Sequence, residues 1–201
     1  FVGITAGFFV NNYQESRRDQ NLEQKYLESF RTNLAADSLE IQAHIQENQN
    51  NLNVSRRAVM AMRGSGLSKD SALAVMQLMA TFNNFNMQDA TYESIVNSGN
   101  LGLIGDYNLK EELVSYYRSR DDIDEVELVL NNYINDYIIP YLFDKIDLIT
   151  GDMSDDFDPM SREFKNMTGG YYVLMDQKVD LILDLDSLNH ALISNLAHHM
   201  H

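Results

Sequence analysis

The chain has 201 residues, a length that suits a single folded domain with its own core. A hydrophobic content of 44% with ten Gly and two Pro excludes a disordered chain and favours helices. There is no Cys, which excludes disulfides, thiolate metal sites and a Cys nucleophile, and the net charge of −15 argues against a nucleic-acid partner.

The first segment, Phe1 to Val10, is uncharged and ends abruptly at two asparagines. Ten residues are too few for a bilayer, which needs about 20, so we predict that residues 1–12 are the C-terminal part of a longer transmembrane helix. A buried helix or the end of a cleaved signal is the alternative. The residues that we assign to contact with lipid or a partner helix are Gly3, Gly7, Phe8, Phe9 and Tyr13.

Residues 13–201 are predicted to form a helical bundle, which makes the fold class all-α. No Gly or Pro interrupts residues 13–62, and apolar residues recur there at spacings of three, four and seven. One long helix should therefore continue from the anchor. Asp37, Ser38 and Asn48 interrupt its apolar stripe, which favours a bundle face over a regular coiled coil.

Four shorter elements should follow a break at residues 64–66. Ser68 should cap a second helix, a loop should cover residues 83–89, and a third helix should span about 91–96. A fourth should begin with a capping-box-like pattern at Asn108 and end near Arg120.

A fifth helix is predicted from about residue 122 to residue 149, with a kink at Pro140. Tyr133, Tyr137 and Tyr141 lie four apart on one face, and we expect packing rather than ligand stacking as their role. After an acidic loop at 151–159, a last helix should run from about residue 160 to residue 197, with a bend or break at Gly169-Gly170.

Several short patterns resemble a known family. They are Val2-Gly3-Ile4 with Ala6, Asn11-Asn12-Tyr13-x-Glu15, Thr91-Tyr92-Glu93-Ser94-Ile95, Ser98-Gly99-Asn100-Leu101 and Arg162-Glu163-Phe164-x-Asn166. Together they resemble an uncharacterised bacterial family, common in Bacteroidota, of single-pass membrane proteins with a domain of unknown function. One departure is Tyr13, where the family usually has Trp.

The resemblance implies a bacterial inner-membrane protein with one spanning helix and a helical domain in the periplasm. It brings no catalytic residues. Taken alone, Arg17 and Arg18 would favour the cytoplasmic side by the positive-inside rule, but acids follow them closely. We therefore follow the resemblance and predict a periplasmic domain.

An acidic loop offers a weak calcium candidate. Asp152, Ser154, Asp156, Asp158 and Glu163 occupy positions 1, 3, 5, 7 and 12 of a calcium-loop register. Phe157 stands where that loop requires Gly, so we expect a solvated turn with Asp158 or Ser161 capping the last helix.

Other chemistry is not indicated. His190, His198, His199 and His201 gather near the end of the chain, but their spacing does not converge on one metal, and His44 stands alone on the long helix. No phosphate loop, nucleophile elbow or zinc-helix motif occurs in the sequence. We therefore predict no enzyme activity, no metal and no cofactor.

Two functions fit these observations. The first is a non-enzymatic accessory or scaffold subunit of an inner-membrane assembly, which binds other subunits or copies of itself through the anchor helix; Gly3 and Gly7 motivate it. The alternative is a periplasmic sensory bundle with a small ligand between its helices, motivated by the tyrosine-rich helix and Pro140.

Overall fold

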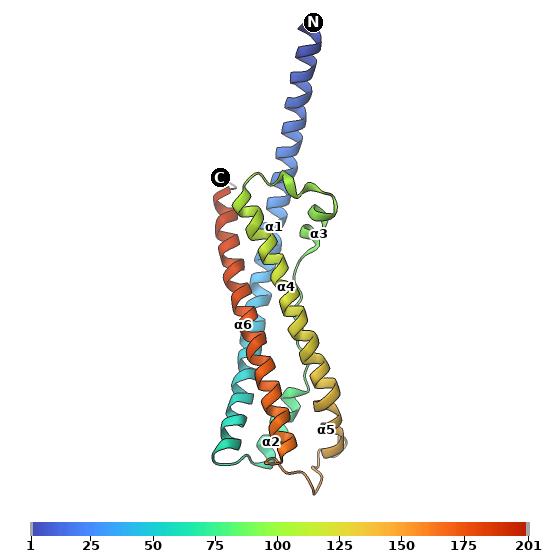
Figure 1. The fold of residues 1–201 in the computed structure, drawn as a ribbon, viewed down its shortest axis with the longest axis vertical. Coiled ribbons are helices and arrows are strands. Elements are labelled where there is room, and N and C mark those ends of the chain that lie inside the picture. Colours follow the sequence, from blue (N-terminus) through green and yellow to red (C-terminus); the bar gives the residue numbers. More distant parts are fainter. Residues whose placement is uncertain (1, 200–201) are drawn as a thin grey trace. The chain divides into compact units, whose positions relative to one another are not determined.

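The computed structural model describes the backbone of residues 2–199 and the side chains of residues 11–199. Its elements are α1 (Val2–Arg63), α2 (Lys69–Met79), α3 (Ala90–Asn97), the 3-10 helix η1 (Asn100–Leu103), α4 (Tyr107–Tyr133), the π-helical turn η2 (Ile134–Ile138), α5 (Ile139–Lys145) and α6 (Arg162–His199) (Figure 1). Residues 2–199 contain no strand, only an isolated bridge between Ile146 and Met153. The predicted all-α fold class is confirmed.

The predicted anchor belongs to α1, which begins at Val2. In the part of the chain that the structure describes, no helix is both long enough and apolar enough for a membrane span. Phe1, and the side chains of Gly3, Gly7, Phe8 and Phe9, lie outside the described residues.

The chain divides into two compact units. The first unit comprises Phe1–Glu40, Asn86–Ser119 and Leu185–His201, and the second comprises Ile41–Phe85 and Arg120–Asp184. The three long helices α1, α4 and α6 each contribute one part to each unit.

The core of the first unit combines aliphatic residues with a group of aromatic rings. Tyr117 of α4 stacks on Tyr92 of α3 with ring centroids 4.5 Å apart, and it also lies 5.9 Å from the ring of Phe30. The buried apolar residues around them include Leu27, Leu34, Ile95, Ile104, Leu109, Leu113, Leu185, Leu192 and Leu196. The resemblance motif at residues 91–95 therefore contributes to this core.

The core of the second unit is larger and rich in methionine. Its residues include Leu52, Met62, Val75, Met76, Met79, Leu130, Ile134, Ile138, Tyr141, Phe157, Phe164, Met167, Tyr171, Met175 and Val179. Phe157 packs edge-to-face on Phe164, with ring centroids 5.8 Å apart. The acidic loop is thus fixed by a buried phenylalanine at the position where a calcium loop requires glycine.

Polar side chains begin three of the helices. Ser68 accepts the Ser71 N–H at 3.2 Å, which confirms the predicted cap of α2, and Ser161 accepts the Phe164 N–H at 3.2 Å at the start of α6. The capping-box start at Asn108 is wrong. Asp106 instead accepts the Leu109 N–H at 2.8 Å, and α4 begins at Tyr107, two residues before the first helical position that a cap at Asn108 predicts.

Three predicted boundaries are also wrong. The predicted fourth helix continues past Arg120 to Tyr133, because no Gly or Pro stops it. The predicted fifth helix ends at Lys145 rather than at residue 149, where the bridge between Ile146 and Met153 takes over. Gly169 and Gly170 do not split α6, which runs unbroken from Arg162 to His199.

Residues 81–89 connect α2 to α3 without regular structure. An extended segment leaves its backbone N–H and C=O groups without helical partners, and buried groups of this kind need others. In both units these partners are buried side chains from the long helices.

Candidate functional site

The first unit buries a carboxylate that is held by neutral hydrogen-bond donors. Asp37 accepts the Gln88 N–H and the Tyr116 hydroxyl, both at 2.8 Å. Asn189 donates to the same tyrosine oxygen at 3.2 Å and to the Leu34 carbonyl at 3.1 Å. Burial raises the pKa of Asp37, and it raises the pKa of Tyr116 as well. Asp37, Tyr116 and Asn189 thus form one hydrogen-bonded group. It binds the backbone of Gln88 in the connecting segment and of Leu34 in α1.

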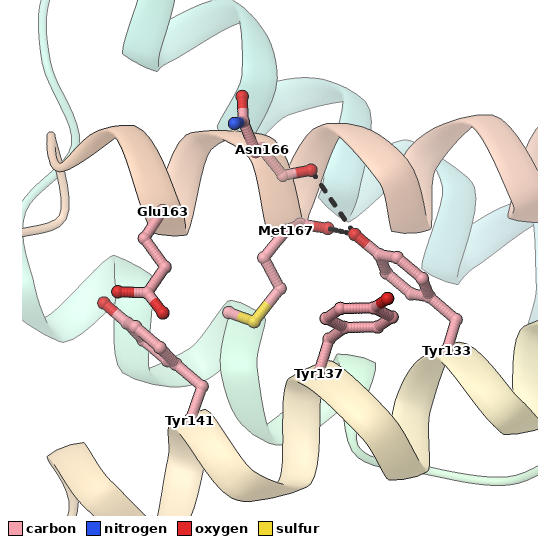
Figure 2. Close-up of a pocket in the computed structure, with 6 residues that line it drawn as sticks. All are labelled: Tyr133, Tyr137, Tyr141, Glu163, Asn166 and Met167. Carbon is pink, nitrogen blue, oxygen red and sulfur yellow. Dashed lines mark hydrogen bonds between the residues drawn. The ribbon is translucent and has the colours of Figure 1, made fainter.

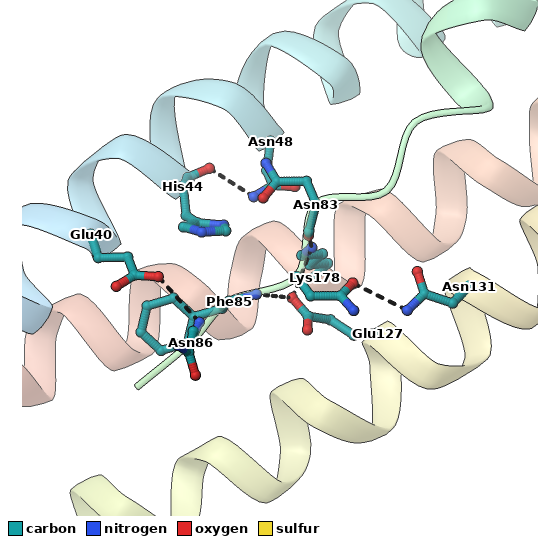
Figure 3. Close-up of polar contacts among 10 residues, drawn as sticks. Glu40, His44, Asn48, Asn83, Phe85, Asn86, Glu127, Asn131 and Lys178 are labelled. Carbon is teal, nitrogen blue, oxygen red and sulfur yellow. Dashed lines mark hydrogen bonds and ion pairs between the residues drawn. The ribbon is translucent and has the colours of Figure 1, made fainter. Parts of the chain in front are cut away.

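In the second unit, a buried ion pair binds the backbone of Asn83 and Phe85 in the same segment (Figure 3). Lys178 Nζ lies 2.9 Å from Glu127 Oε1, and the two side chains are only 2% and 5% exposed. Glu127 accepts the Phe85 N–H at 2.8 Å, while Lys178 donates to the Asn83 carbonyl. Both charges therefore bind backbone as well as each other, which is a structural role.

A separate cavity lies in the second unit, between the tyrosine-rich helix and α6 (Figure 2). Its volume is about 270 Å³, near the lower end of small-ligand pockets. The residues that line it are Tyr133, Tyr137, Tyr141, Glu163, Asn166 and Met167. We call this set the tyrosine pocket.

The π-helical turn places the tyrosines at this cavity. Pro140 lacks the N–H that would bond to the preceding turn, and the Ile139 N–H bonds to Ile134 five residues back. Ile134 and Ile138 are buried, whereas Tyr137 is 61% exposed. The prediction that all three tyrosines serve as core packing is therefore wrong for Tyr137, because the wider turn gives the buried face to the isoleucines.

Gly170 sets the position of the Tyr133 ring. A Cβ at residue 170 would lie 2.3 Å from the Tyr133 hydroxyl oxygen, so only glycine admits the ring there. The hydroxyl donates to the Met167 carbonyl at 3.0 Å (Figure 2). One wall of the tyrosine pocket is thus held by α6.

The pocket offers ring faces, hydroxyls and one carboxylate. The rings of Tyr133 and Tyr137 have centroids 5.2 Å apart and planes tilted by 38°, and the Tyr141 hydroxyl lies beside the Glu163 carboxylate (Figure 2). Burial raises the pKa of Tyr133 and of Tyr141, so both phenols stay protonated near neutral pH. The pocket lining contains no basic side chain and no pair of a nucleophile with its base.

The calcium candidate is not assembled as a ligand set. Asp156 pairs with Lys145 at 2.7 Å and accepts the Ser154 hydroxyl at 2.7 Å, and Asp158 accepts the Met160 N–H. The same loop contains Asp152, while Glu163 lines the tyrosine pocket. Across the described side chains, no group of three or more acids and histidines is arranged to hold a metal ion.

His44, His190 and His199 each contact a different side chain. His199 pairs with Asp106 at 3.1 Å, and His190 lies 3.5 Å from Asp186, one turn away on α6. His44 packs edge-to-face against Phe85 with centroids 5.4 Å apart. His201 lies outside the described residues.

The only predicted anchor side chain that the structure describes is Tyr13. It is 59% exposed, and the Arg17 guanidinium lies 5.0 Å from its ring centroid. The side chains of residues 11–18 are all exposed, and the first buried side chain among the described ones is Leu27.

Comparison of the chain with family models, with curated proteins and with solved structures found no match in any of the three. The family that the sequence resembles therefore stays a prediction.

Proposed function

We propose that this chain is a non-enzymatic accessory or scaffold subunit of a bacterial inner-membrane assembly, anchored through the start of α1, with its helical domain in the periplasm. The observation that carries the proposal is the exposure of α1 at residues 11–18, where every side chain is exposed. Helices gain most of their stability from packing an apolar face, and this stretch has no buried side chain. A bilayer or another subunit would supply the contacts that the chain's own core does not.

The sequence of the same helix supports an anchor. The uncharged segment at residues 2–10 continues into the exposed stretch within one helix, and Tyr13 with Arg17 follows where an interfacial aromatic is expected. Gly3 and Gly7 stand four apart, the spacing that favours close helix contacts in membranes. Other subunits, or copies of this chain, are the proposed partners.

Vesicle flotation tests the anchor directly. The chain is mixed with vesicles of phosphatidylethanolamine and phosphatidylglycerol at physiological salt, which screens its negative charge. We expect the protein to float with the vesicles, and Phe8→Asp to abolish flotation because a charge in the bilayer costs several kcal/mol. Leu39→Asp is the matched control, since Leu39 is 78% exposed on the same helix.

The assembly is tested separately. After gentle detergent extraction from bacterial membranes, native mass measurement should find the chain with a companion subunit or with itself. A monomer alone would contradict the scaffold proposal, and a chain that stays out of the vesicle fraction would contradict the anchor.

A second candidate function is a ligand-binding bundle, and the tyrosine pocket favours it. The pocket has a defined volume, aromatic walls and one carboxylate, which is the composition of a small-molecule site. The neutral alcohol 3,3-dimethyl-1-butanol is a suitable probe because it fits a small aromatic cavity.

Methyl NMR of the methionines gives the readout. The Met167 signal, assigned through Met167→Leu, should shift on adding the alcohol, while that of Met60, 66% exposed on α1, should not. An unchanged Met167 signal up to the solubility limit of the alcohol would count against a pocket open to neutral ligands.

A further inference from the structure

We infer that the tyrosine pocket binds a small organic cation, a methylated or primary ammonium group, between its rings and Glu163. This inference rests on the second candidate function, ligand binding in the same pocket. It is independent of the membrane anchor.

The ring geometry suits a cation. An ammonium group is attracted to the face of an aromatic ring when it lies within about 6 Å of the ring centroid. Tyr133 and Tyr137 have centroids 5.2 Å apart and are tilted rather than stacked, so one group can lie within that distance of both. Tyr141 adds a third ring on the same side of the cavity (Figure 2).

The charge of the pocket selects the same ligand class. Glu163 is the only ionisable side chain of the lining besides the tyrosines, and its carboxylate lies beside the Tyr141 hydroxyl (Figure 2). An anion would meet this carboxylate with no basic side chain in the lining to balance it. A metal ion would find one carboxylate where divalent cations need several oxygen ligands. An organic ammonium needs one counter-charge and aromatic faces, which are what the lining supplies.

The surrounding chain reinforces the selection. Residues 121–158 include Tyr133, Tyr137 and Tyr141 and contain twelve acids and one base, Lys145. All of these acids except Glu127 are exposed. Such a surface raises the local concentration of cations and speeds their association. The volume of about 270 Å³ limits the ligand to a small one.

Choline and its neutral isostere test the inference. Choline and 3,3-dimethyl-1-butanol share size and shape and differ in the charge of the trimethyl group. Titrations followed by calorimetry and by the Met167 methyl signal should show choline binding at least tenfold more tightly, as cation–π contacts with a carboxylate partner predict.

Two substitutions locate the site. Tyr137→Leu should weaken choline binding about tenfold, and it should fold normally because Tyr137 is 61% exposed. Glu163→Gln should weaken choline binding by a similar factor and leave the alcohol unaffected. Tyr107→Leu, at a 65% exposed tyrosine of the first unit, and Glu125→Gln, an exposed acid on α4, are the matched controls.

The outcomes separate the two ideas. Equal binding of choline and the alcohol would overturn the cation inference while the ligand pocket stands. Binding of neither compound would overturn both. Choline binding that survives Tyr137→Leu and Glu163→Gln would place its site elsewhere and overturn the inference as well.

Discussion

Both units bind backbone of the irregular segment 81–89 with a buried carboxylate, but the electrostatic surroundings of the two carboxylates differ. Residues 81–89 run without regular structure, and each unit buries a carboxylate that accepts a backbone N–H from its part of the segment. In the first unit Asp37 has two hydrogen-bond donors, Gln88 and Tyr116. In the second unit Glu127 also has the ammonium of Lys178 at 2.9 Å.

This difference separates two costs of burying a charge. A paired charge is compensated as long as both partners remain, and the loss of either leaves the other buried and unpaired. A carboxylate held only by neutral donors keeps part of its desolvation cost, and its pKa rises as a result. The second unit should therefore be more sensitive to substitution, and the first unit more sensitive to pH.

The largest expected effect comes from breaking the buried ion pair. Lys178→Met should lower the free energy of unfolding by about 3–5 kcal/mol, because Glu127 is left charged in the core and the Asn83 carbonyl loses its donor. Urea unfolding followed by circular dichroism measures the loss.

Two comparisons check the cause. Adding Glu127→Gln to Lys178→Met should recover about 1 kcal/mol or more, since the unpaired charge is removed and Gln can still accept the Phe85 N–H. Arg56→Met removes an ion pair to Asp176 in which both side chains are nearly half exposed, and it should cost less than about 1 kcal/mol. Equal losses from Lys178→Met and Arg56→Met would contradict the explanation.

A smaller effect is expected in the first unit. Asp37→Ala should lower the free energy of unfolding by about 2–3 kcal/mol, because the Gln88 N–H and the Tyr116 hydroxyl both lose their acceptor. Relief of the buried charge offsets part of that cost. Glu28→Ala, at an exposed acid of α1, is the control and should change stability by less than about 0.5 kcal/mol. A loss as large as that of Lys178→Met would erase the contrast between the units.

The buried polar residues of α1 could have been found from spacing. Asp37 and Asn48 are polar but stand at positions of the apolar stripe. Asp37 lies three residues after Leu34 and four before Ile41, and Asn48 lies seven after Ile41 and four before Leu52. Both are fully buried. Their partners could not be found in this way, because Gln88 and Tyr116 are distant in sequence and only the path of residues 81–89 brings Gln88 to Asp37.

The tyrosine pocket is harder to predict from the sequence. The four-residue spacing of Tyr133, Tyr137 and Tyr141 predicts a shared helix face, and Pro140 predicts a disturbance of that helix. The response to Pro140 is a π-helical turn, which moves the isoleucines into the core and leaves Tyr137 exposed. No local pattern indicates that Glu163, thirty residues after Tyr133, lines the same cavity.

The stability of the first unit should depend on pH through Asp37. Because burial raises the pKa of Asp37 in the folded chain, its contribution to stability is fully present below its ordinary pKa and is lost as pH rises through the raised value. Asp37→Asn does not titrate there. The stability advantage of the natural chain over Asp37→Asn should therefore be largest below about pH 4 and decline as the pH rises above the ordinary pKa of an aspartate.

Urea unfolding of both proteins across that pH range measures the difference, from which the titration of all other groups largely cancels. An advantage that stays constant, or that grows as pH rises, would show that Asp37 is not held at a raised pKa.

The smallest expected effects come from two adjacent glycines of α6, and they test how firmly the second unit holds the wall of its pocket. A Cβ at Gly169 would meet no atom within 4 Å, so Gly169→Ala should stabilise the helix by about 0.5–1 kcal/mol through the higher helix propensity of Ala. A Cβ at Gly170 would lie 2.3 Å from the Tyr133 hydroxyl oxygen and 2.7 Å from its ring, so Gly170→Ala must displace that ring. Overpacking of this kind costs about 1–3 kcal/mol, which exceeds the propensity gain, and a net loss of about 1–2 kcal/mol is expected. If Tyr133 instead swings freely into the cavity, Gly170→Ala would be as stabilising as Gly169→Ala in thermal unfolding, and the hydrogen bond from Tyr133 to the Met167 carbonyl would not hold the pocket in shape.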